Sequence, residues 1–141
     1  MAISLYSALD VAASGLNAQR TRMNTIASNL ANARTTRGTD GGPYRRIDPV
    51  FEAVPISRAS ELERNVAQVR VKEIRQDDRP GQMVYDPGHP DANAQGYVEY
   101  PNVNVVEEMA NMMSASRSYE AGVAAIESIK AMARAATGIG R

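Results

Sequence analysis

The chain has 141 residues, and its 16 basic and 16 acidic side chains leave no formal net charge at pH 7. Because proteins that bind nucleic acid usually carry a clear basic excess, this balance argues against a nucleic-acid partner. The chain has no cysteine, which excludes disulfides, thiol catalysis and cysteine-bound zinc, and its length suggests one small domain with extensions.

Residues 1–37 are predicted to form the first element, an amphipathic helix. Leu9, Leu16, Met23 and Leu30 recur every seven residues, which is the spacing of a coiled-coil seam. A helix that packs only on its own domain is the alternative. The length of the repeat favours a seam against another helix.

The start of this helix also bears on export and membrane insertion. No Lys or Arg precedes Arg20, so the basic region that opens a cleavable secretory signal is missing. No apolar run approaches the roughly 20 residues that a membrane span needs. We therefore expect a chain that does not span a membrane and that lacks a conventional signal peptide.

Two asparagines stand near the end of the same helix, in the stretch ASNLANARTT. Asn29 and Asn32 lie three residues apart, hence on one face, although asparagine is a poor helix former. They could be catalytic groups, a helix exit, or part of a surface that binds another chain. The absence of a nearby nucleophile, base or metal set argues against the first.

The middle segment, residues 38–101, contains all seven prolines and four short runs of β-like sequence. In the second run, Val69 and Val71 alternate with charged residues, as in a strand with one solvated face. We expect a small β-rich insert with long loops and no deep pocket. The runs are RRIDPVFEAVPI, NVAQVRVKEI, GQMVYD and GYVEY.

The C-terminal segment, residues 102–141, is predicted to be helical again. Asn104 and Glu107 have the spacing of a capping box at its start. Gly122 is an irregularity, because a glycine inside a helix costs roughly 1 kcal/mol relative to alanine. An apolar stripe follows the cap, with a gradual drift; it comprises Val105, Met109, Met112, Ser116, Tyr119, Val123, Ile126 and Ala133.

Together these elements predict an α+β fold. Long N- and C-terminal helices pair as a coiled-coil-like hairpin, and the β-rich insert lies between them. A lone helical hairpin would leave much apolar surface in water, so we expect neighbouring chains to cover it.

The best enzyme-like constellation is Asp86, His89 and Asp91 in the stretch YDPGHPDAN. A carboxylate beside an imidazole can bind a metal ion or act as acid and base. However, no second histidine exists to complete a zinc site, and the prolines and glycine are typical of a tight loop. We therefore predict no enzyme, no metal and no cofactor, and a hydrolase centred on His89 is the weakest alternative.

Several of these stretches resemble the flagellar basal-body rod proteins of bacteria. The N-terminal match is the heptad helix that ends in Ser-Asn-Leu-Ala-Asn, residues 28–32, followed by Thr35 and Thr36. Residues 41–46, 86–109 and 114–121 resemble the short proximal-rod members of this family. Gly122 departs from the pattern, since asparagine is common there.

This resemblance implies a structural subunit of the proximal rod that polymerises helically into the hollow drive shaft of the flagellum. It implies export by the type III apparatus without a cleaved signal peptide, and a place in the periplasmic part of the basal body. The implied partners are itself, other rod proteins including distal rod subunits, the adaptor between the MS ring and the rod, and the export apparatus. A coiled-coil adaptor of another assembly is the alternative function.

We expect the assembly contacts to come from the heptad-like positions and from the two asparagines. These candidate intersubunit residues are Leu9, Leu16, Met23, Ile26, Asn29, Leu30, Asn32, Met109, Met112, Tyr119, Val123 and Ile126.

Overall fold

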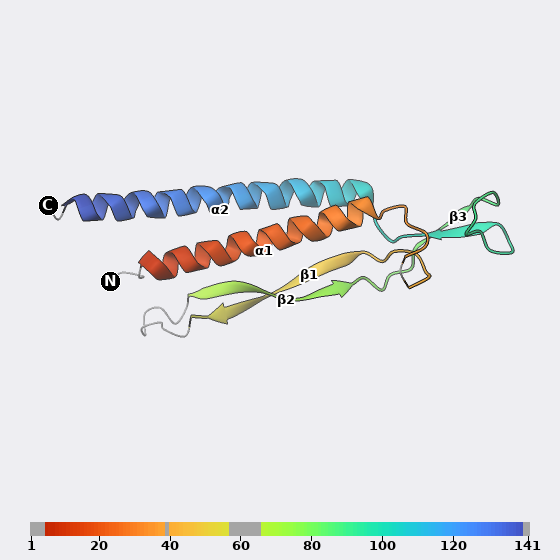
Figure 1. Cartoon of the computed structure of the whole chain (residues 1–141), viewed down its shortest axis with the longest axis horizontal. Coiled ribbons are helices and arrows are strands. Elements are labelled where there is room, and N and C mark those ends of the chain that lie inside the picture. Colours follow the sequence, from red (N-terminus) through yellow and green to blue (C-terminus); the bar gives the residue numbers. More distant parts are fainter. Residues whose placement is uncertain (1–4, 39, 57–65, 140–141) are drawn as a thin grey trace.

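The computed structural model describes residues 5–38, 40–56 and 66–139. It has a long helix at each end of the described chain and four strands between them, which confirms the predicted α+β fold (Figure 1). In chain order the elements are α1 (Leu5–Ala31), β1 (Ile47–Pro55), β2 (Ala67–Gln76), β3 (Gln82–Tyr85), β4 (Tyr97–Tyr100) and α2 (Val105–Ile139).

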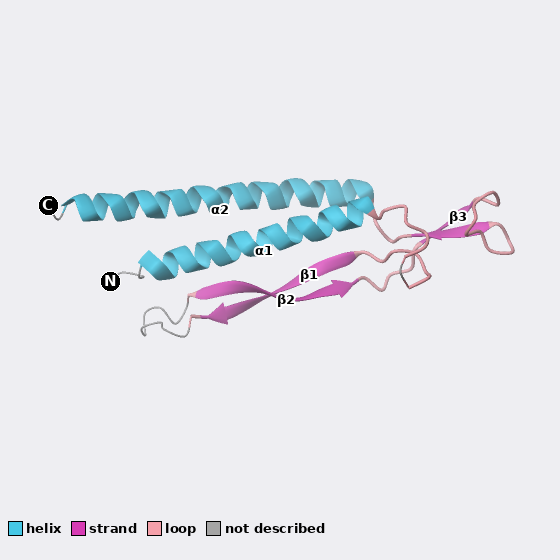
Figure 2. Ribbon diagram, in the orientation of Figure 1, coloured by secondary structure: helices cyan, strands magenta, loops and turns pink. Residues whose placement is uncertain are grey.

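Helix α1 is the middle layer of the molecule. It packs against α2 on one side and against the β1–β2 hairpin on the other (Figures 1 and 2). The β3–β4 hairpin projects past the helices, at the end where α1 stops and α2 begins (Figure 1). Neither helix, over its described length, has a stretch apolar enough to cross a membrane.

The four predicted β-like runs become strands, but they form two separate sheets rather than one. Strands β1 and β2 pair antiparallel from Ile47–Gln76 to Pro55–Ala67, with a shift of register after Val50. Strands β3 and β4 pair from Gln82–Tyr100 to Tyr85–Tyr97. No ladder joins the two pairs in the described part of the chain, so each is a two-stranded ribbon.

The antiparallel register of the helices is fixed by two contacts. Asn29 donates to Glu108 near one end, and Leu16 lies against Gly122 near the middle. In an antiparallel pair of helices, the numbers of two facing residues have a nearly constant sum. This sum is 137 for the first contact and 138 for the second, so both contacts belong to one register. By the same register Met23 faces Ala115, whose side chain is fully buried.

Gly122 is a packing position in this seam. Helix α2 continues through it to Ile139, so the glycine does not end the helix. A Cβ atom at this position would lie 2.7 Å from Cδ2 of Leu16, closer than side chains normally approach. The missing side chain therefore leaves the space that Leu16 fills.

Half of the capping box that the sequence predicts is found at the start of α2. The Asn104 side chain accepts from the amides of Val106 and Glu107, at 3.0 and 3.2 Å. These bonds satisfy two of the amides that have no partner within the helix. The return bond from the Glu107 side chain, which a full capping box would add, is absent from the described contacts.

The apolar core is small. Ala18 and Ile26 come from α1, Ala115 comes from α2, and Val98 and Val103 lie at the base of the β3–β4 hairpin. Two of the five are alanines, which bury little area. Apolar packing alone therefore holds the layers of this chain weakly.

Replacing Gly122 tests the seam. Leucine at this position would overlap Leu16, and overpacking of this kind typically costs 1–3 kcal/mol, roughly 0.8 kcal/mol of which is offset by the better helix propensity of leucine. We expect Gly122→Leu to lower the free energy of unfolding in urea by about 1 kcal/mol.

The matched control is Ala121→Leu, because Ala121 is exposed on the same helix turn. It should leave the unfolding midpoint unchanged, and adding Leu16→Ala to Gly122→Leu should recover part of the loss. A Gly122→Leu chain as stable as the wild type would show that α1 and α2 do not pack closely here.

Candidate functional site

A buried polar cluster joins the end of α1 to the start of α2. At its centre is Asn29, which is only 1% exposed. Its Nδ2 donates to the backbone oxygen of Ile47 at 2.9 Å and to Oε2 of Glu108 at 3.0 Å. Its Oδ1 accepts from the Ile47 amide and from the Tyr44 hydroxyl, both at 2.9 Å. Both donors and both lone pairs of the amide are therefore used inside the chain.

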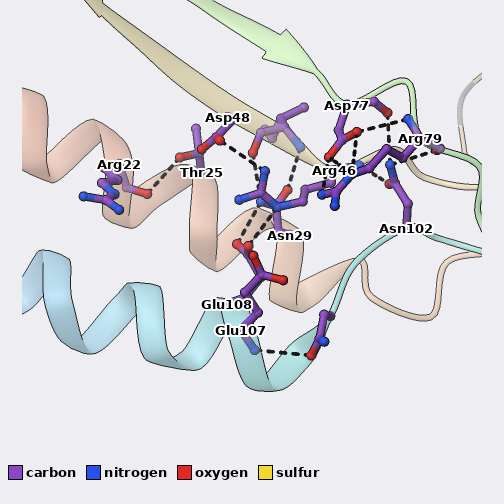
Figure 3. A network of polar contacts seen from close by, with 12 residues as sticks. Arg22, Thr25, Asn29, Arg46, Asp48, Asp77, Arg79, Asn102, Glu107 and Glu108 are labelled. Atoms are coloured by element: carbon purple, nitrogen blue, oxygen red, sulfur yellow. Dashed lines mark hydrogen bonds and ion pairs between the residues drawn. The ribbon is translucent and has the colours of Figure 1, made fainter.

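Glu108 is also only 1% exposed, and it connects α1 to the segment before β1 (Figure 3). While Oε2 accepts from Asn29, Oε1 accepts from Nε of Arg46 at 2.9 Å. Arg46 also donates to Asp48 at 3.1 Å. Burial acts to lower the pKa of Arg46, but its hydrogen bonds to Glu108 and Asp48 outweigh burial and raise the pKa. The cluster thus pairs a buried carboxylate with a guanidinium whose side chain is 12% exposed.

Asn102 extends the cluster to the loops around it. Its Oδ1 accepts from the Arg46 amide at 2.8 Å, and its Nδ2 donates to the backbone oxygens of Asp77 and Arg79 at 3.0 and 3.1 Å. The side chain of Arg79 hydrogen-bonds the Asp77 carboxylate and lowers the pKa of that carboxyl to about 2. The segments before β1, after β2 and before α2 are therefore fixed to one another (Figure 3).

Asn32 has a local role at the helix exit. Its Nδ2 donates to the backbone oxygen of Ser28 at 2.9 Å, and its Oδ1 accepts from the Thr35 hydroxyl at 3.2 Å. The next threonine, Thr36, reaches a distant loop, because its hydroxyl donates to Asp91 at 2.8 Å. Asp91 also forms an ion pair with Arg37. The helix exit and the loop between β3 and β4 are thereby connected.

The loop that contains Asp86, His89 and Asp91 has the geometry of a tight turn. Nδ1 of His89 accepts from the Asp91 amide at 3.1 Å, and Oδ1 of Asp86 accepts from the Gly88 amide at 3.3 Å. The Asp91 carboxylate is already engaged by Thr36 and Arg37. No group of three metal-ligating side chains gathers anywhere in the described residues.

The candidate intersubunit residues divide into two groups by exposure. Most of them lie at least partly inside the single chain, and Asn29 and Ile26 are fully buried. Met109 and Val123 are exposed, at 56% and 36%, so their side chains remain free for a neighbour. Those partly buried are Leu9, Leu16, Met23, Leu30, Asn32, Met112, Tyr119 and Ile126.

The apolar stripe that the sequence predicts on α2 shifts gradually around the helix, and the structure explains this shift. The stripe combines the inner seam, which faces α1, with an outer flank that nothing covers in the single chain. The predicted stripe contains half of the seam positions and misses Glu108 and Gly122, because a hydrophobicity pattern does not reveal them; a 4-3 spacing counted from Glu108 would have found the whole seam. The partly or fully buried positions of this seam are Glu108, Met112, Ala115, Tyr119, Gly122, Ile126, Ile129 and Ala133.

Comparison with known proteins gives consistent matches at both ends of the chain. The family model described as flagella basal body rod protein matches residues 9–38. The model described as the C-terminal domain of flagellar basal body rod FlgEFG proteins matches residues 94–139. The first match covers most of α1 and its exit, and the second covers β4 and α2.

Curated relatives match almost the whole chain. The chain is 44% identical to the flagellar basal-body rod protein FlgC of Borreliella burgdorferi, across 97% of this chain and 98% of that protein. It is 46% identical to FlgC of Aquifex aeolicus, across 91% of both chains. It is 40% identical to FlgC of Bacillus subtilis, across 99% of this chain and all of that protein.

Neutralising Glu108 tests the buried cluster. Glu108→Gln would remove the carboxylate that pairs with the partly buried guanidinium of Arg46, and because Arg46 keeps Asp48 and some access to water, the cost is about 2 kcal/mol, below that of breaking a fully buried pair. We expect a loss of this size in the free energy of unfolding, measured by urea titration of the purified chain.

The neighbouring Glu107 provides the control, since its side chain is exposed in the same helical turn. Glu107→Gln should change the stability by less than about 1 kcal/mol. Equal effects of the two substitutions would contradict a structural role for the buried charge.

Proposed function

Because this chain belongs to the FlgC family of flagellar basal-body rod proteins, and so is a structural subunit of the rod in the flagellar basal body, we propose that it polymerises helically through its terminal helices. The polymer is the hollow shaft that carries torque from the motor to the hook. Its relatives are structural proteins rather than enzymes.

The observation that carries this proposal is the amount of uncovered surface. The chain exposes 9953 Å², whereas a compact monomer of 15.2 kDa exposes about 7,100 Å². An elongated chain exposes more surface for its mass than a compact one, so this chain has surface available for contacts with neighbours. A subunit surrounded by neighbours is the arrangement that uses such a surface.

The distribution of that surface supports assembly through the helices. Helix α2 is covered by α1 on one side only, as Figure 1 shows. Exposed large apolar side chains follow its outer flank, among them Val106, Met109 and Met113. An exposed apolar stripe of this kind is typical of a protein–protein contact.

The proposal extends to partners, export and location. The chain contacts further copies of itself and other rod proteins, with the adaptor between the MS ring and the rod on one side and distal rod subunits on the other. It passes through the flagellar export apparatus without losing a signal peptide and comes to lie in the periplasm.

The intersubunit role predicted for the twelve candidate residues stays a proposal, and in the single chain it is open to the exposed ones, since Asn29 and Ile26 are buried. Met109 and Val123 test it best, because they are the two most exposed of the twelve candidates. We expect Met109→Asp and Val123→Asp to abolish motility in soft agar and rod assembly, since a buried unpaired carboxylate is strongly unfavourable.

The control variants Met109→Leu and Val123→Ile keep an apolar side chain of similar size and should preserve motility. The purified Asp variants should unfold at the same urea concentration as the wild type, which separates assembly from folding. Normal motility in both Asp variants would refute the assignment of this flank to a subunit contact.

A further inference from the structure

Oε1 of Gln19 is buried at the seam between α1 and α2, and no hydrogen-bond donor among the described residues reaches it. Gln19 interrupts the apolar stripe of α1 between Leu16 and Met23, and by the register of the seam it faces Tyr119. A buried acceptor without a donor is costly, and native proteins contain few of them. The seam therefore has a weak point near its middle.

The seam is packed more tightly on one side of this point than on the other. On the side of the polar cluster, Ile26, Asn29, Glu108 and Ala115 are at most 3% exposed. On the other side, every seam position that the structure describes is at least partly exposed. Because less burial gives less stabilisation, this half of the seam separates at a lower cost. Its partly exposed positions are Leu9, Ala12, Leu16, Gly122, Ile126, Ile129 and Ala133.

In the less buried half, α1 is supported by the β1–β2 hairpin, whereas α2 packs against α1 alone among the described elements. Oγ of Ser14 accepts from the amide of Val69 at 3.1 Å, and Ala18, one turn further along the same face of α1, is 4% exposed. In Figure 1 the two helices lie closest near the polar cluster and diverge toward the start of α1. If they part in this half, α2 is the helix that moves.

Gly122 provides a bending point in α2, at the layer where it meets Leu16. Glycine restricts the backbone least of all residues, and only proline favours a helix less. Gly122 comes three residues after Tyr119, hence beside the unpaired amide of Gln19. The part of α2 before Gly122 is held at the polar cluster, while residues 123–139 are held only by the less buried half of the seam.

Residues 123–139 have the composition of a helix that is covered on several sides. Their only charged members are Glu127, Lys130 and Arg134. By the register of the seam Ile126 and Ile129 lie toward α1, whereas Val123 is 36% exposed and Met132 is 62% exposed. A helix that is apolar on most sides is normally buried on most sides, and α1 covers only one.

We propose that α2 bends at Gly122 when the chain enters the rod, so that residues 123–139 leave α1 and pack among neighbouring subunits. The polar cluster keeps the first part of α2 on α1, and the bend opens the seam beside the unpaired amide of Gln19. In the free chain α1 partly covers Ile126 and Ile129, so less apolar surface is offered to other copies before assembly. The inference rests on the proposed function and adds that the free chain and the rod subunit differ in this part of α2.

Pairs of cysteines test the bend, because the chain contains no cysteine of its own. By the register of the seam, Leu9 faces Ile129 and Met23 faces Ala115, seven residues to either side of the layer that contains Gly122. One variant carries Leu9→Cys with Ile129→Cys, beyond the bend. The matched control carries Met23→Cys with Ala115→Cys, on the side of the polar cluster. Oxidation of the purified chain should close a disulfide within one chain in both variants.

Isolated basal bodies would be oxidised in the same way, and the remaining thiols counted by maleimide labelling. We expect the control disulfide to form there as in the purified chain, and the disulfide between positions 9 and 129 to be lost. Formation of both disulfides within one chain in basal bodies would overturn the proposal, because α2 would then be unbent. Loss of both would place the change elsewhere than at Gly122 and would overturn it too.

A second measurement uses Gln19→Leu and applies even if a cysteine variant fails to fold or assemble. Leucine removes the unpaired buried amide, so the purified chain should unfold at a higher urea concentration. The swimming zone in soft agar should shrink, because α2 leaves α1 less readily. Met23→Leu, one turn further along α1 on the side of the polar cluster, is the control and should change neither quantity.

A Gln19→Leu chain that is more stable but supports normal swimming would contradict the proposal, and so would one that is no more stable than the wild type. Absence of the unmodified chain from isolated basal bodies would instead refute the proposed function.

Discussion

Glu108 is held at 1% exposure between Asn29 and Arg46, and the arrangement of the rest of the chain depends on this contact. The apolar core is too small to fix how the layers meet, since two of its five residues are alanines. A buried carboxylate tolerates few alternatives, because any shift that leaves it without donors costs several kcal/mol. The polar cluster therefore specifies the arrangement more sharply than apolar packing does.

The same cluster explains why the two ends of the sequence depend on each other. Asn29 comes from α1 and Glu108 from α2, and they are 79 residues apart. Arg46 and Asn102 bind the connecting segments to the same point. The seam then continues from this point along the helices, through Leu16 and Gly122. One end of the helical pair is thus fixed, while the outer flank of α2 remains uncovered for neighbouring subunits.

The sequence was sufficient for the elements and their order, because apolar periodicity and turn residues are local signals. The four β-like runs and both helices were predicted close to their observed positions. The division of the strands into two separate ribbons was not predicted, since strand pairing is a long-range property that alternation alone does not encode.

The candidate site was harder to predict for a similar reason. Asn29 and Asn32 were singled out as polar residues in a helix, but their partners Ile47 and Glu108 lie far along the chain. In the sequence Gly122 stands out as an irregularity, although in the structure it is the position that receives Leu16. A hydrophobicity pattern cannot identify a seam position that is occupied by a carboxylate or by a missing side chain. The intersubunit contacts require a second subunit, and they stay predictions.

In this account one polar cluster fixes the two helices to each other within the chain, and neighbouring subunits cover the outer flank of α2. A density map of the assembled basal body that resolves side chains in the rod tests it most directly. The account predicts that Asn29, Arg46 and Glu108 keep their internal contacts, while Val106, Met109 and Met113 are covered by an adjacent subunit. A rod in which this outer flank of α2 faces water, or in which the Glu108 cluster is opened to bind another chain, would contradict it.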